Sequence, residues 1–552
     1  MRERILLRKT SALILACVLL LTLVLAGCSS SEKGSGEVDA NGKVPMNVFV
    51  HQGSDMNLAT NKFTKKMEEK FNIKFNWTTV PFDGAAEKRQ ISLASGDYPD
   101  LYLLIPWVDR FSQTDLLKFG QQGVILPLND LIDQHAPNIK KVLDSNDYYK
   151  AMNTAPDGKI YGLTGLNECF HCSYPNKMWV NTKWMEQLNI KEPTTTEEFR
   201  EMLKAFKTKD PNGNGKADEV PLSGSTENFG VHIIPYLMNG FIYDDDRNYL
   251  ILNQGKVETV ANKPEWKEGL TYIKSLYDEG LIDPGAFTQN VGAFKKIGDN
   301  AEAQLLGAGA AMHPSLFVTT AEGSPYGNDY NPIPPLKGPN AEYASYNYPV
   351  DPGATFVLTN KASEQTQITA IKMLDYFYTQ EGAMASYLGE EGTSWRKPEE
   401  GEVALNDQVQ PLYKAIPLPS GEEPRNDSWS ALSQYNHHRA YRDAEVQGTD
   451  IYANDGYERR LYEATLLMEG KEPKEVFPHW ALWVDPSLAD ETSMMQTNIK
   501  DYIDQNALQF ITGAKSLDKD WDEYVKGLEG LNMNRYLEIM QSAYDASSVS
   551  SK

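Results

Sequence analysis

The sequence predicts an α/β protein that folds into two or more lobes. Strand-like and helix-like segments alternate through residues 45–105, and this order is typical of a parallel sheet covered by helices. The strand expected at 101–105 is apolar throughout, as in a strand buried on both faces. The chain has 552 residues, which is more than one typical domain contains, so a second lobe is expected.

The first lobe is expected to begin near residue 44. Strands are predicted at 45–50 and 73–80, each followed by a helix, at 57–70 and 86–96. Gly96 supplies the expected end of the second helix.

Helical spacing continues along the rest of the chain. A helix is predicted over 196–207, with a capping box formed by Thr194 and Glu197. Further helices are expected at 264–280, at 367–379 and throughout the C-terminal tail, and strands at 307–312 and 354–360.

The N-terminus has the layout of an export signal. Four basic residues precede an apolar run at 11–27, which is short of the about 20 residues that a membrane span needs. The run ends in Leu-Ala-Gly-Cys, which resembles the lipobox of bacterial lipoproteins and implies cleavage before Cys28 and lipidation of its thiol. An uncleaved helical anchor is the alternative. Both place the bulk of the protein outside the cytoplasm, held at a membrane.

A polar segment and an acidic chain follow the predicted signal. Residues 28–43 contain one large apolar residue, Val38, and are expected to form a flexible tether that reaches about 20 Å. Of the 53 basic and 76 acidic side chains, four and one lie in the signal, which leaves 49 and 75 and a net charge of −26. This balance argues against nucleic acid, which requires clustered Lys and Arg, and against electrostatic binding to anionic lipid.

Cysteine is scarce after the signal. Only Cys169 and Cys172 follow Cys28, and their spacing in an exported protein favours a short-range disulfide. A metal site that adds His171 is the alternative, although it offers three ligands and no second cluster. A catalytic redox pair would need a thioredoxin-like context, which the sequence does not show.

The stretch from Asp210 to Glu219 has the start of a calcium-binding loop. Oxygen donors stand at positions 1, 3, 5 and 9, and Gly215 stands at position 6, where such loops turn sharply. Position 12 is Pro221, so the usual bidentate Glu is missing, and an ordinary turn is the alternative. We expect structural calcium, which fixes the preceding helix to the next strand. The expected ligands are Asp210, Asn212, Asn214, Lys216 through its carbonyl, Asp218 and Glu219.

Several stretches, taken in order, resemble the family 1 extracellular solute-binding lipoproteins of ABC importers. They are GDYPDLYLL, YGLTG, KMWVNTKWMEQLNIKEPTTTEEF, DPNGNGKADE, YDEGLIDP, GAGAAM and ITG…WDEYVKGLEGL. The likeness covers nearly all of the mature chain and is greatest to alginate-binding proteins and related Gram-positive lipoproteins. Thr164 stands where the family usually has Pro. The resemblance also implies that Asp218 and Glu219 replace the missing bidentate ligand.

This resemblance implies a two-lobed periplasmic-binding-protein-like fold. Each lobe has a central sheet flanked by helices, and the ligand cleft lies at the hinge, with crossings expected near 155–162 and 335–352. The lobes close on the ligand and dock on the transmembrane subunits of an ABC permease. The expected division is 1–27 signal, 28–43 tether, 44–157 and 341–395 N-lobe, and 158–340 and 396–552 C-lobe with the C-terminal helices.

An oligosaccharide is the expected ligand, and a monomer the expected state. Aromatic faces stack on the C–H faces of pyranose rings, while carboxylates and amides accept hydrogen bonds from hydroxyls. The residues expected to line the cleft are Trp107, Glu168, His171, Ser173, Tyr346, Tyr348, Trp395, Arg396, Trp429 and Trp480. An acidic sugar would need clustered cations, for which Arg396, Arg439 and Arg442 are available.

Two other functions remain open from the sequence. A secreted glycoside hydrolase needs two carboxylates beside the scissile bond, and an acidic chain always contains such pairs. A peptide- or metal-carrying lipoprotein is the third reading. No metalloprotease, serine hydrolase or nucleotide-binding motif is present, so a binding protein rather than an enzyme is expected.

Overall fold

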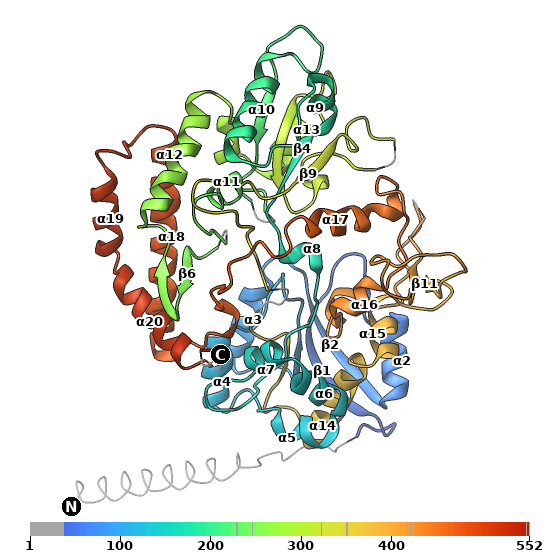
Figure 1. The fold of residues 1–552 in the computed structure, drawn as a ribbon. Coiled ribbons are helices and arrows are strands. Elements are labelled where there is room, and N and C mark those ends of the chain that lie inside the picture. Colours follow the sequence, from blue (N-terminus) through green and yellow to red (C-terminus); the bar gives the residue numbers. More distant parts are fainter. Residues whose placement is uncertain are drawn as a thin grey trace, which may run out of the picture.

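A computed structural model describes residues 38–227, 230–245, 247–321, 323–348, 352–419, 421–547 and 549–550. The predicted signal, the lipidation site at Cys28 and most of the tether lie outside these residues. Two four-stranded sheets organise the described chain, one in the lower and one in the upper part of Figure 1. The mixed α/β class predicted from the sequence is therefore confirmed.

The first sheet has the strand order β10-β3-β1-β2. Strands β1 (Val44–His51), β2 (Ile73–Val80) and β3 (Leu101–Leu103) run parallel, and β10 (Phe356–Leu358) joins β3 antiparallel. Strand β1 is buried at most positions because it has neighbours on both sides, whereas β2 alternates between buried and exposed residues over much of its length because it is an edge strand.

Helices cover both faces of the first sheet. Met46 and Val48 of β1 pack in one apolar core, while Phe49 packs in another on the opposite face, as the alternation of a strand requires. The first face carries α2 (Lys62–Lys70), α5 (Asn129–His135), α6 (Pro137–Ser145), α7 (Asp147–Asn153) and α14 (Glu364–Phe377); the second carries α3 (Ala85–Ser95) and α4 (Gln113–Gln121). Helix α15 (Gln380–Tyr387) continues from α14.

The second sheet has the strand order β5-β8-β4-β9. Strand β8 (Leu306–Ala311) runs parallel to β5 (Val220–Ser223) and antiparallel to β4 (Lys177–Asn181), which also pairs with β9 (Tyr330–Ile333). The small residues of β8 admit close neighbours. A Cβ at Gly307 would meet Phe206 at 2.6 Å, and one at Gly309 would meet Phe294 at 2.8 Å.

The second sheet is also covered on both faces. One core contains α9 (Thr182–Leu188), α10 (Thr196–Thr208), α11 (Ile233–Met238) and α12 (Pro264–Asp278), and the other contains α13 (Val291–Gly298) and α17 (Tyr457–Leu466). Helix α10 buries Phe199, Met202, Leu203 and Phe206. Each contributes about 1.5–3 kcal/mol through burial.

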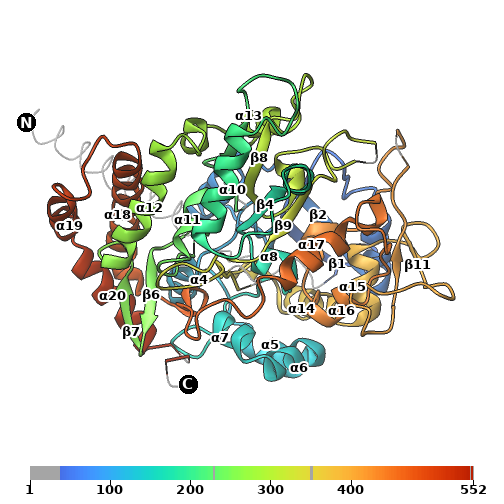
Figure 2. The same cartoon turned by 45° about the horizontal axis from the view of Figure 1, so that its top comes forward.

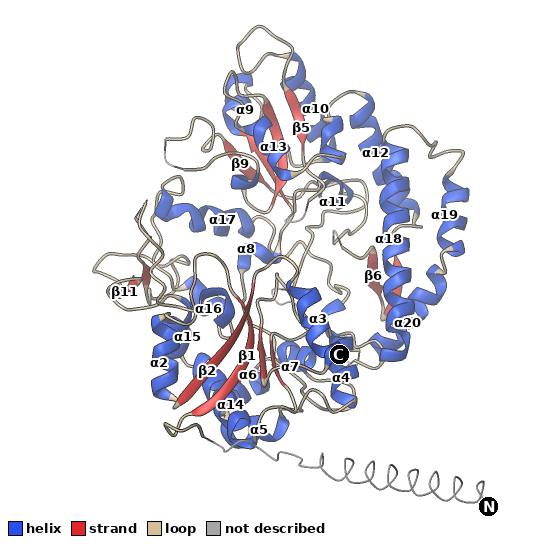
Figure 3. Ribbon diagram, turned by 180° about the vertical axis from the view of Figure 1, so that it is seen from behind, coloured by secondary structure: helices blue, strands red, loops and turns tan. Residues whose placement is uncertain are grey.

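A C-terminal group of helices extends the second core. Helices α18 (Ala489–Ile511), α19 (Trp521–Gly530) and α20 (Met533–Asp545) pack with α12 and the hairpin of β6 (Leu250–Asn253) and β7 (Lys256–Thr259). Figure 3 shows these helices beside both sheets rather than between them. No helix in the described part of the chain is long and apolar enough to cross a membrane.

Several predicted boundaries differ from the structure. The capping box of α10 is formed by Thr195 and Glu198, one residue later than predicted, because three consecutive threonines precede two glutamates and offer two registers. Helix α2 begins at Lys62 rather than at residue 57, since the side chain of Asn61 accepts from the backbone N–H of Thr64 and caps it.

The places where the chain passes from one sheet to the other also differ from the predicted boundaries, as the core contacts of individual residues show. Leu163 and Leu166, placed by the sequence in the C-lobe, pack in the core of the first sheet. Trp429, Leu432 and Trp480 join that core although they fall in the range 396–552. Figures 1 and 2 show α8 (Phe170–Ser173) and α17 between the two sheets.

Candidate ligand-binding site between the two sheets

The carboxyl ends of the parallel strands in the first sheet carry two exposed aromatic residues. Phe82 follows β2 and is 45% exposed, and Trp107 follows β3 and is 56% exposed. Ligands of open α/β sheets bind beyond the carboxyl ends of the strands, so these rings stand where a ligand is expected. Trp107 was predicted as a site residue; Phe82 was missed, although its place after a strand in the sequence VPFDG could have revealed it.

A buried ion pair fixes the segment that bears Trp107. Arg89 on α3 donates to both carboxylate oxygens of Asp109, at 2.6 and 3.0 Å, and also to the carbonyl of Arg110 at 3.1 Å. Its guanidinium lies over the ring of Phe111, 4.4 Å from the ring centroid. These contacts fix residues 109–111, the segment that directly follows Trp107.

The second sheet presents polar groups at its corresponding edge. His313 follows β8, and its Nδ1 lies 2.7 Å from the hydroxyl of Ser315. Burial, with His171 and Lys177 nearby adding to the effect, lowers the pKa of His313 to about 4. His313 is therefore a neutral hydrogen-bonding group at physiological pH.

Five aromatic residues form a series that joins the two sheets. Tyr148 of α7 contacts Trp480, with ring centroids 5.9 Å apart, and Trp480 contacts Tyr348 at 4.9 Å. Tyr348 contacts Tyr346 at 5.3 Å, and Tyr346 contacts Tyr174 at 5.1 Å. We call these residues the aromatic series. Tyr148, Tyr346 and Tyr348 are partly exposed, whereas Trp480 and Tyr174 are buried.

Two glutamates lie along the aromatic series. Glu168 accepts from the hydroxyl of Tyr148 at 2.6 Å and from the backbone N–H of Arg439 at 2.6 Å. Glu472 accepts from the hydroxyl of Tyr174 at 2.6 Å. Burial raises the pKa of Tyr346 to about 12, with Tyr348, Glu472 and Glu168 adding to the effect. Both carboxylates therefore act on the same ring.

The predicted residues His171 and Ser173 lie on α8. The Nδ1 atom of His171 is 2.8 Å from Glu458 of α17, which Arg442 also approaches at 3.6 Å. Ser173 is buried, and its hydroxyl donates to the carbonyl of Cys169 at 3.1 Å. The side chain of Ser173 is thus engaged within α8 itself.

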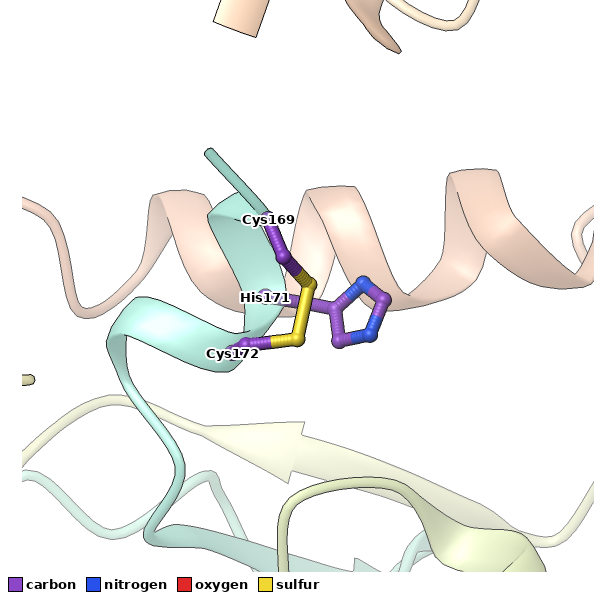
Figure 4. Close-up of side chains that lie close together, drawn as sticks. All are labelled: Cys169, His171 and Cys172. Atoms are coloured by element: carbon purple, nitrogen blue, oxygen red, sulfur yellow. A yellow bond between two sulfur atoms is a disulfide. The ribbon is translucent and has the colours of Figure 1, made fainter. Parts of the chain in front are cut away.

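Cys169 and Cys172 form the predicted disulfide, with Cα atoms 5.2 Å apart. Figure 4 shows the disulfide on α8 with the ring of His171 beside it. Among the described residues, these three form the only group of His, Cys, Asp or Glu ligand atoms that all lie within 4.8 Å of one another. The disulfide occupies both thiols, so the alternative metal site does not form in this state.

Three other predicted residues are engaged away from the aromatic series. Trp429 is fully buried in the first core, and its indole N–H donates to the hydroxyl of Thr64. Trp395 is buried in a small apolar cluster, and its indole N–H donates to the carbonyl of Gly389. Arg396 forms a bidentate ion pair with Glu402. We correct the expectation for these two tryptophans, because packing leaves neither ring open as a platform.

The predicted calcium loop connects α10 to β5. Asp210 accepts from the backbone N–H groups of Asn214 and Gly215, and Asp218 accepts from the side-chain amides of Asn212 and Asn214. These amides lower the pKa of Asp218. The loop therefore gathers oxygen donors at the positions that calcium loops use.

The environment of the Glu219 carboxylate indicates whether the loop is suited to hold a cation. Among the described residues, its Oε1 atom is buried without a hydrogen-bond partner, and burial raises its pKa, with Asp210 and Asp218 nearby adding to the effect. A dication at this position would relieve both features.

The two-sheet fold, with a candidate ligand site between the sheets, is typical of one class of binding protein. A family model for bacterial extracellular solute-binding proteins matches residues 53–384, and the chain belongs to this family. The chain is therefore a solute-binding protein of two lobes.

Particular relatives extend the similarity along most of the chain. The fructooligosaccharide ABC transporter substrate-binding protein FusA of Streptococcus pneumoniae serotype 4 is 27% identical over 501 residues, which is 87% of this chain and 86% of FusA. A crystal structure of an extracellular solute-binding protein from Bifidobacterium longum subsp. infantis superposes with a TM-score of 0.76 at 21% identity, covering 92% of this chain and 99% of that one. An EF-hand mutant of FusA from S. pneumoniae, in complex with fructo-nystose, superposes with a TM-score of 0.67 at 25% identity, covering 91% and 99%.

Proposed function

We propose that this protein captures an oligosaccharide outside the cell and delivers it to the transmembrane subunits of an ABC-type importer. The observation that carries the proposal is the similarity to FusA, which spans most of both chains and includes both lobes. A chain that matched only one lobe could share the fold without sharing a ligand site. Here the whole two-lobed arrangement is common to the two proteins.

The exposed and partly exposed aromatic rings support a sugar as the ligand. Trp107 and Phe82 present open faces on the first lobe, and Tyr346 and Tyr348 present partly open faces between the lobes. Flat apolar faces stack on the C–H faces of sugar rings, while adjacent polar groups fix the hydroxyls. Closure of the lobes would bring these two surfaces onto one ligand.

The passages of the chain between the lobes are part of this proposal. We place them near 166–176, 334–354, 436–460 and 467–484, because core contacts change from one sheet to the other across these segments. Passages gathered beside the aromatic series would form a hinge, as expected for a fold in which two lobes close around a ligand.

We also propose that the protein is a monomer held at the outer face of the membrane through lipidated Cys28. The signal, lipobox and tether of the sequence support this anchor. Mass spectrometry of the membrane fraction should find a diacylated mature N-terminus. A soluble chain that retains residues 1–27 would exclude it.

Calcium in the Asp210–Glu219 loop is a further part of the proposal. The orphaned oxygen of Glu219 and the oxygen donors of the loop support it, as does the EF-hand described for FusA. Calcium would stiffen the connection from α10 to β5, away from the aromatic series. Chelation should lower the melting temperature of the wild type and leave that of an Asp210→Ala/Asp218→Ala variant unchanged. Equal responses of the two proteins would remove the calcium assignment.

A thermal-shift screen of residues 44–552 against oligosaccharides tests the proposed function. A ligand at 100 times its Kd stabilises the folded state by about 2.7 kcal/mol, which shifts the melting temperature measurably. Recovery of the sugar unchanged after incubation separates a binding protein from a hydrolase. Stabilisation by no sugar, or cleavage of the sugar, would contradict the proposal.

A further inference from the structure

We infer that the site between the lobes selects neutral oligosaccharides and rejects acidic ones such as uronates. The inference rests on the proposed function and adds the charge of the ligand to it. It follows from the state of each charged group around the aromatic series. A uronate would bring a carboxylate into this region and would need a cation that is free to receive it.

The arginines of this region are already engaged. The guanidinium of Arg439 lies 3.5 Å from the ring centroid of Phe170 and donates from Nε to both carboxylate oxygens of Asp443 at 2.8 and 3.0 Å. Arg442 donates to Asn167 at 3.0 Å and approaches Glu458 at 3.6 Å. An incoming carboxylate would have to share either guanidinium with the carboxylate that already lies beside it.

Two lysines beside α8 and His313 are engaged as well. Lys177 is fully buried, and its ammonium group donates to the carbonyls of His171 and Tyr174. Lys295 donates to the carbonyl of Ser315 at 3.2 Å. Lys177 cannot reach a ligand without leaving the core, and Lys295 is already directed at a backbone oxygen.

The buried histidines add no positive charge. Burial lowers the pKa of His51 and of His313 to about 4 each, and that of His437 to about 3. All three imidazoles are neutral at pH 7. They can exchange hydrogen bonds with hydroxyls, but they cannot neutralise a carboxylate.

Two carboxylates of the region form no ion pair among the described residues. Within the described residues, Glu168 and Glu472 have no cationic partner, since each accepts only from tyrosine hydroxyls or a backbone N–H. Both lie close enough to Tyr346 to act on its phenol. A uronate placed against Tyr346 would therefore meet two like charges, which weakens binding and lowers the association rate.

Orphaned neutral groups point independently to a ligand rich in hydroxyls. Among the described residues, the Nε2 atom of His437 and the Oδ1 atom of Asn347 are buried without hydrogen-bond partners. Asn347 lies between Tyr346 and Tyr348 in the aromatic series, and the backbone of His437 donates to the carbonyl of Leu166 and accepts from the N–H of Glu168. Hydroxyls both donate and accept, so they can satisfy each of these groups without introducing charge.

The test measures the affinity of residues 44–552 for two sets of oligosaccharides of matched length. Fructo-, gluco- and manno-oligosaccharides form the neutral set, and oligogalacturonates and oligomannuronates form the acidic set. A neutral member should bind at least about tenfold more tightly than any acidic one. The difference should shrink in high salt, because salt screens exposed and partly exposed charges.

A Glu168→Gln variant tests whether the charge of Glu168 causes the discrimination against acidic oligosaccharides. Glutamine can still accept from Tyr148 through its amide oxygen, while its NH2 group then faces the backbone N–H of Arg439, so the charge is removed together with one accepted hydrogen bond. The variant should bind acidic oligosaccharides more tightly than the wild type and keep its affinity for the neutral ligand. Ser173→Ala, which changes a hydroxyl engaged within α8, serves as the matched control and should leave the selectivity unchanged.

The outcomes separate this inference from the proposed function. Tighter binding of an acidic member would overturn the charge selection while leaving the oligosaccharide-binding function in place. Binding of neither set would overturn the proposed function and the selection together. An unchanged ratio in Glu168→Gln would overturn the role given to Glu168.

Discussion

The ion pair between Arg89 and Asp109 offers a quantitative test of how the first lobe holds its ligand-facing turn. Both side chains are buried, at 4% and 5% exposure, and two hydrogen bonds join them. Arg89→Ala would leave the Asp109 carboxylate buried without its cation, which costs about 3–5 kcal/mol. A change of 1 kcal/mol shifts the melting temperature of a unit of 150–250 residues by about 2–4 °C. The transition of the first lobe should therefore fall by about 6–20 °C.

Calorimetry of residues 44–552 without ligand measures this shift. The double variant Arg89→Met/Asp109→Leu is the control, because apolar residues of similar volume often replace a buried ion pair at little cost. The double variant should recover most of the stability that Arg89→Ala loses. If Arg89→Ala melts within 2–3 °C of the wild type, or the double variant is no more stable than the single one, the reasoning fails.

Three further predictions concern stability, pH and the location of the site. Replacing Cys169 and Cys172 with Ser opens a ring of four residues and should lower the free energy of unfolding by about 2 kcal/mol; equal denaturation midpoints would contradict this. Burial lowers the pKa of Lys177 to about 7 from 10.5, so the unfolded chain binds more protons than the folded chain between these values. This lysine therefore makes stability rise with pH from about 7 to 10.5, and Lys177→Met should remove that rise; parallel stability profiles of the two proteins would exclude it. Trp429→Ala should cost about 3–5 kcal/mol of stability, whereas exposed Trp107→Ala should change stability by less than about 0.5 kcal/mol and weaken ligand binding; the reverse pattern would show that the two rings were misassigned.

Local patterns predicted much of the first sheet. Strands β1 and β2 and helices α2 and α3 follow from short-range periodicity, and their ends differ from prediction by one residue at most, except that α2 begins five residues later than predicted. The antiparallel addition of β10 could not be predicted in this way. Strand β10 lies more than 250 residues after its partner β3 in the sequence. Its residue pattern does not indicate whether it pairs parallel or antiparallel.

The roles of individual aromatic residues were the hardest to predict. Trp107 and Trp429 are the same residue type in loop-like sequence, yet one is 56% exposed and the other 0%. Their difference arises from tertiary packing, since Phe63, Phe75 and Phe377 enclose Trp429 from three separate elements. Phe82 shows the converse, because its position after a parallel strand predicts a ligand-facing place that its residue type alone does not.

The disulfide and the calcium loop differ in how far sequence could define them. The spacing of Cys169 and Cys172 allowed a direct bond, and the structure contains it. For the loop, spacing identified the donors, but the orphaned oxygen of Glu219 emerged only from the fold, because burial of that oxygen depends on the surrounding chain.

The most direct test of the proposed function is isothermal titration calorimetry of residues 44–552 with neutral oligosaccharides, for the wild type and for Trp107→Ala. The wild type should bind one sugar per chain in a saturable manner, and Trp107→Ala should weaken that binding by about tenfold or more, since loss of an aromatic contact of about 1.4 kcal/mol has this effect. Saturable binding with an unchanged Kd in the variant would show that the sugar does not bind at the carboxyl ends of the strands in the first sheet. Absence of binding to every neutral sugar, with the wild type folded, would contradict the proposed function itself.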